Sequence, residues 1–394
     1  MQTVVLAAGE GTRLRPLTAT RPKPMLPVAG RPMLEHVLDA AVAGGASRLI
    51  LVVGYHEEAV REHVGEAYHD VPVEYAVQES QDGTADAVRT ARPLLEEEPF
   101  VVLAGDNLYD AGSIAELYES APAICAYHVD DPRPYGVFEL DGEHVVGVVE
   151  KPADPPSNLV NVSAYAFPAA AIEWLDVPES ERGEYELTDV LARLFEAGDV
   201  RAVECERWLD VGRAWELLEA NEWKLGEQER ALHGHVHENA EVTGDVVVEE
   251  GATVRSGAVI EGPALVQAGA SVGPNAYVRG ATVVGPNAKV GHAVEVKNSL
   301  FMAGATAGHL TYVGDSVVGR DVNFGAGTVV ANLRHDDQPV ELTVKGERVS
   351  TGRRKFGVVV GDGAKTGIDT NLNAGVTLST GARSKPGETV TRDR

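Results

Sequence analysis

The chain has 394 residues, enough for about two or three domains with sizeable hydrophobic cores. Asp and Glu total 60 against 34 Lys and Arg, and the formal net charge of −26 argues against a general nucleic-acid partner because the phosphates would be repelled. No run of about 18 apolar residues and no basic-then-apolar leader is present, so we expect no membrane span, no secretory signal and a cytoplasmic protein.

The acidic composition and the cysteines add two further expectations. Dense carboxylates suit a protein in a high-salt cytoplasm, where screening weakens their repulsion, although a merely acidic surface is the alternative. Cys125 and Cys205 are too few and too far apart in sequence for a disulfide framework or a zinc site. We expect both to be buried small apolar residues.

Strand and helix patterns alternate through the first half of the chain. The expected strands are Thr3–Ala7, Arg48–Val53, Val73–Val77 and Phe100–Ala104. The expected helices are Pro32–Val42, Glu57–Val64, Thr84–Leu95 and Ile114–Glu119. This alternation predicts βαβ units and a mostly parallel sheet, with ligands at the carboxyl ends of the strands.

The first strand leads into LAAGEGTRLRPLTATRPKPMLPV, residues 6–28, which is the most informative segment for function. Gly9 and Gly11 let the backbone approach a polyanion closely, so that successive N–H groups can form an anion-binding nest. The spacing is not G-x-G-x-x-G, because Leu14 stands where the third glycine would be. It is not a P-loop either, since no Gly-Lys-Ser/Thr follows.

Three side chains in this segment suit the distal phosphates of a nucleotide. Thr12 supplies a hydroxyl, and Arg13 and Lys23 supply cationic groups. The prolines on either side of Lys23 restrict the loop that carries it.

This segment resembles the signature of sugar-1-phosphate nucleotidylyltransferases, which join a nucleoside triphosphate to a sugar 1-phosphate and release pyrophosphate. The resemblance implies catalytic roles for Arg13 and Lys23. It also implies nucleotide contacts from Leu6, Ala8, Gly9, Gly11 and Thr12.

The segment QESQDGTA, residues 78–85, matches the same family after the third expected strand. By resemblance, Gln78, Gly83 and Thr84 contact the pyrimidine base of UTP or dTTP through amide and backbone groups. Taken alone, Gly-Thr is equally an N-terminal capping turn. Both interpretations stay open from the sequence.

Two carboxylates, Asp106 in LAGDN and Asp210 in WLDVG, also stand in family-like contexts. Mg²⁺ prefers hard oxygen ligands, often one or two carboxylates together with substrate phosphates. We therefore expect Asp106 and Asp210 to be magnesium ligands.

The resemblance further implies that the sugar phosphate is held by Gly136, Glu150, Lys151 and Asn161. Gly136 would admit the sugar closely, Glu150 would accept hydrogen bonds from its hydroxyls, and the other two would donate. The implied reaction is in-line attack of the sugar phosphate oxygen on the α-phosphorus of the nucleotide, driven by positioning and charge neutralisation.

A helical pattern over Ala214–Ala231 separates the two halves, and from Val242 the period changes to six. Aliphatic residues recur without a miss at Val242, Val248, Val254, Ile260, Val266, Val272, Val278, Val284, Val290 and Val296. Small or slender residues stand two positions earlier, and Asn, Asp and Gly are frequent three positions earlier. Hexapeptide repeats of this kind predict a parallel β-helix in which each coil buries its aliphatic residues on the next.

The hexad pattern is interrupted twice. It slips around Phe301–Tyr312, returns with Val318, Phe324 and Val330, and is lost across Leu333–Lys355. It resumes at Val360, Thr366, Leu372 and Leu378. Loops that leave a rigid scaffold often carry function, so we expect function at these interruptions.

Residues 293–332, with GHLTYVGD and NFGAGT, resemble the acyltransferase half of the bifunctional enzymes that make UDP-N-acetylglucosamine. The resemblance implies a left-handed β-helix, a homotrimer with sites between neighbouring prisms, and acetyl-CoA as co-substrate. His309 would be the general base, for which an imidazole is well suited. The other implied contacts are Arg279 and Lys297 to the sugar phosphate, Tyr312, Asn323 and Asn332 to the sugar, and Ala326 to the coenzyme.

Two departures from this family concern the end of the chain. After Asn332 the family reaches its next lysine quickly, whereas here Leu333–Arg354 intervene before Lys355, and we expect a hairpin-like excursion. Ile368 replaces a serine on the coenzyme side.

The predicted fold class is α/β: a Rossmann-like nucleotidyltransferase domain over 1–213, a helical linker over 214–232 and a left-handed β-helix over 233–394. The predicted function is nucleotidyl transfer from UTP or dTTP to a sugar 1-phosphate together with N-acetylation of an amino-sugar 1-phosphate. The alternative is a monofunctional glucose-1-phosphate nucleotidylyltransferase whose β-helix oligomerises or regulates, as in ADP-glucose or GDP-mannose pyrophosphorylases. Lys297, His309 and Tyr312 favour two activities, since a structural coil would not need them.

Overall fold

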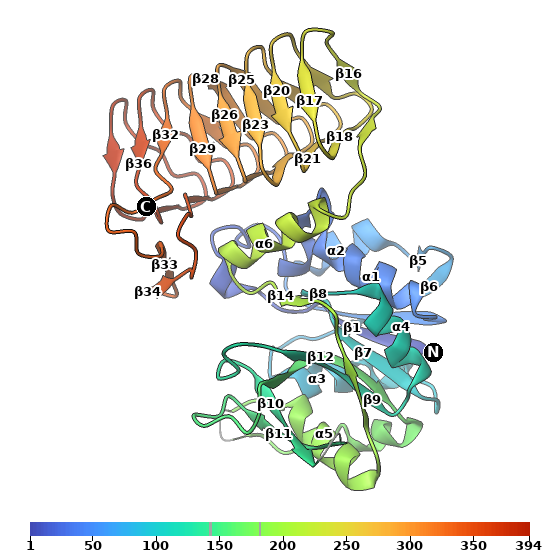
Figure 1. Cartoon of the computed structure of the whole chain (residues 1–394). Helices are drawn as coiled ribbons and strands as arrows, with labels where there is room; N and C mark the ends of the chain where they lie inside the picture. The colour runs from blue at the N-terminus through green and yellow to red at the C-terminus, as the bar shows by residue number, and fades with distance from the viewer. Residues whose placement is uncertain (142–143, 181–182) are drawn as a thin grey trace. The chain divides into compact units, whose positions relative to one another are not determined.

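The computed structural model describes residues 1–141, 144–180 and 183–394, and the chain divides into two compact units (Figure 1). The first unit contains Met1–Glu10, Pro22–Met25 and Pro32–Asp210. The second contains Gly11–Arg21, Leu26–Arg31 and Val211–Arg394. Two short N-terminal segments therefore belong to the second unit, and the boundaries expected at residues 213 and 232 stay a prediction.

A ten-stranded sheet forms the centre of the first unit, in the order β11-β10-β12-β7-β1-β4-β6-β5, with β9 pairing β12 and β13. Its strands are β1 (Gln2–Leu6), β4 (Arg48–Val53), β5 (Ala67–Tyr68), β6 (Val71–Val77), β7 (Phe100–Ala104), β9 (Ala123–His128), β10 (Gly136–Asp141), β11 (His144–Glu150), β12 (Leu159–Phe167) and β13 (Arg201–Glu204). A separate pair joins β8 (Asn107–Tyr109) to β14 (Trp208–Asp210).

The four strands predicted from the sequence are all present, and β7, β1, β4 and β6 run parallel side by side. The expectation of a mostly parallel sheet is wrong for most of the remaining pairs, although β13 does pair parallel with β9. Strand β12 pairs antiparallel with β7, β9 and β10, and β11 pairs antiparallel with β10. The sequence patterns did not indicate these antiparallel strands.

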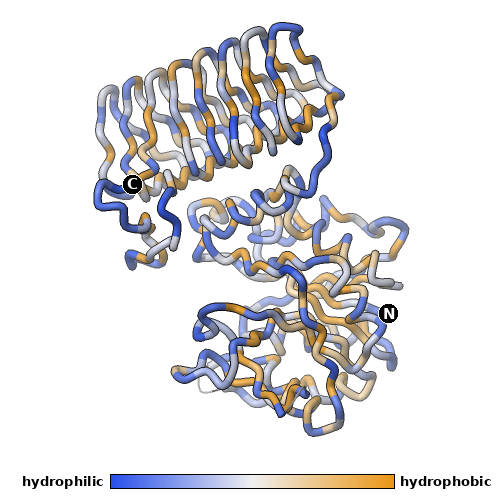
Figure 2. The backbone as a smooth tube through the Cα atoms, in the orientation of Figure 1, coloured by the Kyte–Doolittle hydropathy of each residue, from blue (hydrophilic) through white to orange (hydrophobic). Residues whose placement is uncertain are grey.

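Helices accompany this sheet. They are α1 (Met33–Ala43), α2 (Glu57–Val64), α3 (Thr84–Ala91), α4 (Ala111–Glu119) and α5 (Leu187–Ala197), with the 3₁₀ helices η2 (Lys23–Met25), η3 (Arg92–Leu94) and η4 (Ala169–Trp174). The four predicted from the sequence are present as α1, α2, α3 with η3, and α4, whereas α5, η2 and η4 were not predicted. Helix α4 is capped by Asp110, whose carboxylate accepts a hydrogen bond from the Ser113 backbone N–H at 2.8 Å. The central strands are coloured mostly as hydrophobic in Figure 2, which agrees with the burial of their side chains.

A parallel β-helix with three faces makes up most of the second unit. The first face contains β15 (Ala231–Leu232), β18 (Val246–Val248), β21 (Ala264–Val266), β24 (Thr282–Val284), β27 (Leu300–Phe301), β30 (Val317–Val318), β35 (Val359–Val360) and β37 (Thr377–Leu378). The second contains β16 (His235–Val236), β19 (Thr253–Val254), β22 (Ser271–Val272), β25 (Lys289–His292), β28 (Thr306–His309) and β31 (Asn323–Phe324). The third contains β17 (Glu241–Thr243), β20 (Val259–Glu261), β23 (Tyr277–Arg279), β26 (Glu295–Lys297), β29 (Tyr312–Gly314), β32 (Val329–Val330), β36 (Asn371–Leu372) and β38 (Thr389–Val390).

The remaining elements of the second unit are the 3₁₀ helix η1 (Thr12–Leu14), the short strand β2 (Pro27–Val28) and helix α6 (Ala214–Leu225). Helix α6 falls within the linker that the sequence predicts. In the short strand β3 (Arg31–Pro32), Arg31 is assigned to the second unit and Pro32 to the first.

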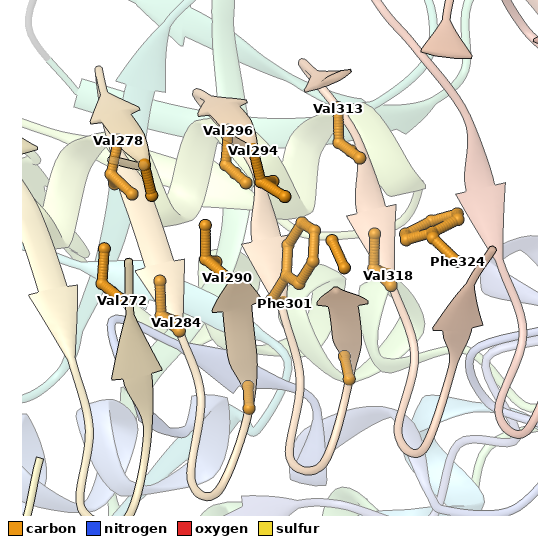
Figure 3. Close-up of a cluster of buried hydrophobic side chains, with 14 of the residues drawn as sticks. Val272, Val278, Val284, Val290, Val294, Val296, Phe301, Val313, Val318 and Phe324 are labelled. Atoms are coloured by element: carbon orange, nitrogen blue, oxygen red, sulfur yellow. The ribbon is translucent and has the colours of Figure 1, made fainter. Parts of the chain in front are cut away.

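The hexad residues are the core of the β-helix. Every predicted aliphatic from Val248 to Val296 is fully buried, with 0% exposure. In Figure 3, Val278, Val296 and Val313 stack into one column and Val284, Phe301 and Val318 into another. The predicted fold class is thus confirmed: an α/β unit followed by a parallel β-helix.

The slip in the hexad pattern has a simple structural cause. In the first coils Val248 pairs with Val266, 18 positions further along the chain. From Val284 to Phe301, and again from there to Val318, the step is 17 positions. One residue is lost at each of these turns, so the columns continue although the sequence period does not.

The second interruption is the expected hairpin. Strands β33 (Glu341–Val344) and β34 (Glu347–Ser350) pair antiparallel outside the three faces, and Leu333 pairs with Lys355 where the excursion leaves and rejoins the β-helix. Across it, Val318 pairs with Val360 on the next coil. The excursion therefore does not interrupt the stack.

Two further expectations concern burial and the membrane. Cys125 and Cys205 are both buried and unbridged, as predicted, and a hydrogen bond between them together with burial raises the pKa of the Cys125 thiol well above its usual value. Within the described ranges, no helix is long and apolar enough to cross a membrane.

We expect Phe301→Ala to destabilise the β-helix by about 3–5 kcal/mol, because it removes a fully buried ring from a column where the coil is one residue short. The centre of the Phe301 ring lies 6.1 Å from that of Phe324, so the substitution would also remove a contact of Phe324. Urea unfolding followed by circular dichroism measures the loss. Leu232→Ala, at a side chain that is 39% exposed, is the matched control, and a loss no larger than that of the control would contradict the prediction.

Candidate functional site

Lys23 lies between the two carboxylates that the sequence proposes as metal ligands. Its Nζ donates to Asp106 Oδ2 at 2.5 Å and lies 3.6 Å from Asp210 Oδ1. The lysine is 5% exposed, whereas the two carboxylate side chains are about one third exposed, at 33% and 31%. Three predicted residues from distant parts of the sequence therefore meet at one partly exposed place.

The local fold explains why these groups meet. Asp106 follows β7, and the next residue, Asn107, pairs with Asp210 across the β8–β14 ladder. Gly105, which lies between β7 and Asp106, donates its N–H to the Leu6 carbonyl at 2.9 Å. A Cβ at Gly105 would lie 2.8 Å from that carbonyl oxygen, so the close approach requires glycine.

The donor set at this place fits a magnesium ion that is shared with substrate. Across the residues that the structure describes, no group of three or more His, Cys, Asp or Glu could hold a metal ion by itself. Two partly exposed carboxylates are nevertheless the usual protein contribution to Mg²⁺ when phosphates and water complete the shell. Asp106 and Asp210 would hold such an ion.

The loop that the sequence predicts to contact the nucleotide follows β1 and begins beside this region. Leu6 ends β1, Ala8 is 4% exposed, and a Cβ at Gly9 would meet no atom within 4 Å. The side chain of Gln81, which the sequence did not single out, donates to the Ala8 carbonyl at 3.0 Å. The backbone at Gly9 is open enough for a phosphate to approach.

The next part of the loop, Gly11–Arg21, belongs to the second unit. Gly11 has φ 65°, a left-handed conformation that favours glycine, and it precedes η1, which carries Thr12 and Arg13. Arg13 is exposed, and a Cβ at Gly212 would lie 2.9 Å from its Nη2. The glycine of the Trp-Leu-Asp-Val-Gly segment thus leaves room for the Arg13 guanidinium.

The proposed base-contacting residues are closely packed. The Gln78 amide donates to Asp86 at 2.8 Å and to the Gly83 carbonyl at 3.3 Å. A Cβ at Gly83 would meet the Tyr185 carbonyl oxygen at 2.3 Å, and the Thr84 hydroxyl accepts the N–H of Leu187 at 3.0 Å. Packing alone therefore explains Gly83 and Thr84, and their contact with the base stays a prediction.

Three of the four predicted sugar-phosphate residues come together on neighbouring strands. Gly136 pairs with Glu150, and a Cβ at Gly136 would lie 2.9 Å from Glu150 Oε2 and 3.5 Å from Asn161 Cβ. Asn161 Oδ1 accepts hydrogen bonds from the Ser163 N–H and the Tyr165 hydroxyl, both at 2.9 Å. The fourth residue, Lys151, is more exposed and lies 3.2 Å from Glu150.

An aromatic contact connects this group to the carboxylate pair. The ring of Tyr135 lies 5.5 Å from that of Trp208, edge to face, and Trp208 is on the same strand as Asp210. The Trp208 indole N–H is buried and has no hydrogen-bond partner within the described part of the chain. The predicted sugar and metal residues thus lie along one edge of the first unit.

A second cluster of predicted residues occupies the third face of the β-helix. Arg279 and Lys297 are register partners on β23 and β26, so their side chains leave adjacent coils, about 4.8 Å apart. Glu295 accepts from Arg279 at 2.8 and 3.0 Å, and this hydrogen bond raises the pKa of Arg279. Two cations side by side suit a phosphate.

A buried carboxylate, Asp315, holds the other polar groups of this face. It accepts from Lys297 Nζ at 2.9 and 3.1 Å, from Asn298 at 3.0 Å and from Asn332 at 2.6 Å. The Asn332 amide also donates to the Tyr312 hydroxyl at 3.1 Å. Burial raises the pKa of Tyr312, with the charge of Asp315 adding to the effect, so its hydroxyl stays protonated and can orient a ligand.

Glycine at position 314 makes this arrangement possible. A Cβ there would lie 2.5 Å from the Tyr312 hydroxyl and 2.7 Å from the Asn332 amide nitrogen. Gly314 stands in the column of Arg279 and Lys297, and its missing side chain is the space that the tyrosine and asparagine use.

The other three predicted acetyl-transfer residues are not joined to this cluster. His309 ends β28 on the second face and is exposed, with the register partner His292 on the coil before it. Asn323 is also exposed on the second face, and the Ala326 carbonyl accepts from the Asp369 N–H at 2.8 Å. Within the described residues, no hydrogen bond links the His309 side chain to Tyr312 or Lys297.

Sequence reasoning missed the carboxylates that hold the predicted cations. Glu295 lies two positions before Lys297 and was visible in the same segment. Asp315 is the last residue of GHLTYVGD, and its φ of 51° is a backbone conformation that Asp tolerates. Both lie about one coil further along the chain than the cation that they hold, so only a search that uses the coil spacing would have found them.

Comparisons with known proteins agree with the division of the chain into two parts of different architecture. The nucleotidyl transferase family matches residues 2–226, and the GMPPB C-terminal domain family matches residues 260–361. The bifunctional protein GlmU of Methanococcus vannielii is 40% identical over 385 residues, covering 95% of this chain and 91% of the relative. The bifunctional sugar-1-phosphate nucleotidylyltransferase/acetyltransferase of Sulfurisphaera tokodaii is 37% identical over 402 residues, covering 100% and 98%.

A shorter relative matches the first half alone. The UTP–glucose-1-phosphate uridylyltransferase AglF of Haloferax volcanii is 40% identical over 223 residues, covering 54% of this chain and 91% of that protein. The two longer relatives, in contrast, match both units and so cover the second cluster of polar residues as well.

Asp106→Asn and Asp210→Asn should each weaken binding of a divalent cation in the presence of UTP, because each replaces an anionic oxygen ligand by a neutral one. We expect about a tenfold or larger rise in the dissociation constant for Mn²⁺, measured by electron paramagnetic resonance in place of Mg²⁺. Asp199→Asn, at an exposed aspartate, is the matched control. If a variant binds Mn²⁺ as tightly as the control does, the substituted aspartate is not a metal ligand.

Proposed function

The chain belongs to the family of bifunctional sugar-1-phosphate nucleotidylyltransferases/acetyltransferases, and we propose that it uses UTP or dTTP, a sugar 1-phosphate and acetyl-CoA. The first activity transfers the nucleotidyl group to the sugar 1-phosphate and releases pyrophosphate. The second moves an acetyl group from the coenzyme to the amine of an amino-sugar 1-phosphate. The observation that carries the first assignment is the position of the Lys23 ammonium between Asp106 and Asp210.

In nucleotidyl transfer, an oxygen of the sugar phosphate attacks the α-phosphorus and the bond to pyrophosphate breaks. Lys23 is buried and held by Asp106, so its charge is fixed in position before substrate arrives. Arg13 is exposed and would meet the distal phosphates, while Gly136, Glu150 and Asn161 would orient the sugar. A magnesium ion on Asp106 and Asp210 would neutralise phosphate charge.

In acetyl transfer, the sugar amine attacks the thioester carbonyl, a C–N bond forms and the thiolate of CoA leaves. Arg279 and Lys297 would bind the sugar 1-phosphate, and Tyr312 and Asn332 would orient the sugar ring. His309 would accept the proton that the amine loses, and the leaving thiolate would be protonated in turn.

The exposed position of His309 supports a homotrimer. Leu310 beside it is 63% exposed, and Val329 and Ile368 are 44% and 55% exposed on other coils of the β-helix. Apolar side chains at these levels of exposure suit burial against a neighbouring copy, which would then complete the acetyl-transfer pocket. Because UTP and acetyl-CoA are intracellular metabolites, the proposal also implies a cytoplasmic enzyme.

The test measures both products in the purified protein. Pyrophosphate release is followed with UTP or dTTP and a panel of sugar 1-phosphates, and free CoA is followed with acetyl-CoA and a panel of amino-sugar 1-phosphates. Release of both products supports two activities. Pyrophosphate without CoA would favour the alternative, a monofunctional nucleotidylyltransferase with an oligomerising or regulatory β-helix.

His309→Ala should lower kcat for acetyl transfer by about 10²–10⁴, the range for losing a positioned general base. Nucleotidyl transfer and the oligomer mass should not change, because His309 is exposed and lies outside the aliphatic columns. Stopped-flow detection of CoA and light scattering measure the two effects. Wild-type acetylation by the variant would show that His309 is only a corner residue.

Gly314→Ala should lower acetyl transfer by about tenfold or more, because the added methyl group displaces the Tyr312 hydroxyl or the Asn332 amide. We expect nucleotidyl transfer to stay at the wild-type level. Thermal unfolding of the variant separates this local effect from loss of the fold. Wild-type kcat and KM for the amino sugar would mean that these two groups do not touch it.

A further inference from the structure

A buried carboxylate of the β-helix is bonded to the nucleotide loop. Asp362 follows β35 and is 9% exposed. Its oxygens accept from the Thr20 hydroxyl at 2.6 Å and from Arg21 Nη2 at 2.7 and 2.9 Å. They also accept from the backbone N–H of Arg320 at 2.8 Å and from its Nε at 3.0 Å. All these residues belong to the second unit, so the contacts lie within it.

Burying the charged Arg21 side chain costs free energy, so its burial here needs an explanation. It is 7% exposed, burial lowers its pKa, and its Nε has no hydrogen-bond partner within the described residues. Its Nη1 lies 3.3 Å from the sulfur of Met302, which is a weak acceptor. Apolar side chains of similar volume would often serve stability equally well at such a place. The Arg21–Asp362 ion pair is therefore better explained by the position in which it holds the loop.

The loop transmits this geometry through its own hydrogen bonds. The Thr18 hydroxyl, fully buried, donates to the Gly11 carbonyl at 2.9 Å, and the Leu14 N–H donates to the same oxygen at 2.9 Å. The Leu17 N–H follows with a bond to the Leu14 carbonyl at 3.0 Å. The turn that carries Thr12 is thus bonded at both ends to the segment that ends in Arg21.

A close backbone approach fixes the same segment beside Asp362. A Cβ at Gly361 would lie 3.0 Å from Cβ of Pro16, so the loop touches the coil that carries the carboxylate. The Arg320 guanidinium also donates to the Thr20 hydroxyl at 3.0 Å. The loop is therefore held by van der Waals contact, by charge and by a shared hydroxyl.

We propose that Asp362 is a positioning residue for nucleotidyl transfer, acting through Thr20 and Arg21 on the loop that carries Thr12 and Arg13. This inference rests on the proposed function. It gives the β-helix a role in the first reaction that is separate from acetyl transfer, and it adds to that reaction a residue more than 300 positions away from the loop in sequence.

The test is Asp362→Asn, which keeps the shape of the side chain and removes its charge. We expect kcat for nucleotidyl transfer to fall by about 10- to 100-fold, as for a small misplacement of groups at a reaction centre. KM should rise for the nucleotide and stay unchanged for the sugar 1-phosphate, because the residues proposed to hold the sugar lie in the first unit. Acetyl transfer should stay at the wild-type level, and Asp362→Glu should restore part of the loss.

Asp321→Asn is the matched control, since Asp321 is an exposed corner residue of the same β-helix whose left-handed φ of 55° asparagine tolerates. If Asp362→Asn does not fold, Thr20→Val removes one anchoring hydroxyl from an exposed position and should raise KM for the nucleotide in the same way. Wild-type kinetics in a folded variant, or an equal loss in both activities, would overturn the proposal. A wild-type protein that releases no pyrophosphate would instead overturn the proposed function.

Discussion

The spacing of stacked coils controls how the second unit presents its polar groups. Each coil buries an aliphatic residue at every sixth position, and the register this imposes puts residues 17 or 18 apart beside one another. Arg279 and Lys297 are neighbours for that reason alone. The phosphate-sized spacing of two cations is thus a by-product of hydrophobic packing, because moving either side chain would require shifting a whole column.

Three cations of the proposed sites each have a carboxylate partner. Lys23 is held by Asp106, Arg279 by Glu295, and Lys297 by Asp315. In a chain with a net charge of −26, a long flexible cation would otherwise sample many acidic groups. A dedicated partner limits the rotamers of each cation. Asp362 does the same for Arg21, although there the result is a fixed loop rather than a binding site.

Most of the fold could be predicted from the sequence because its two periodicities are strong. The four parallel strands of the first unit and the columns from Val248 to Val296 are present where the sequence predicts them. The antiparallel strand β12 was not predicted, since it pairs with β7, β9 and β10 and its pattern resembles that of any buried strand. Among the site residues, Asp315 and Asp362 were missed because their partners come from other coils or from the opposite end of the chain. Gly83, which the sequence linked to base binding, packs against Tyr185 at a distance that only glycine allows.

The excursion between Leu333 and Lys355 has a practical meaning for how the solenoid tolerates change. Val318 and Val360 occupy adjacent coils although 42 positions separate them, so the coil closes without regard to the length of chain that leaves it. The hairpin turns at Lys345 and Gly346, both with positive φ, between strands that pair only with each other. An insertion at that turn, such as a fluorescent reporter or an affinity tag, would lengthen a branch of the chain rather than shift a column, and the stack would keep its register.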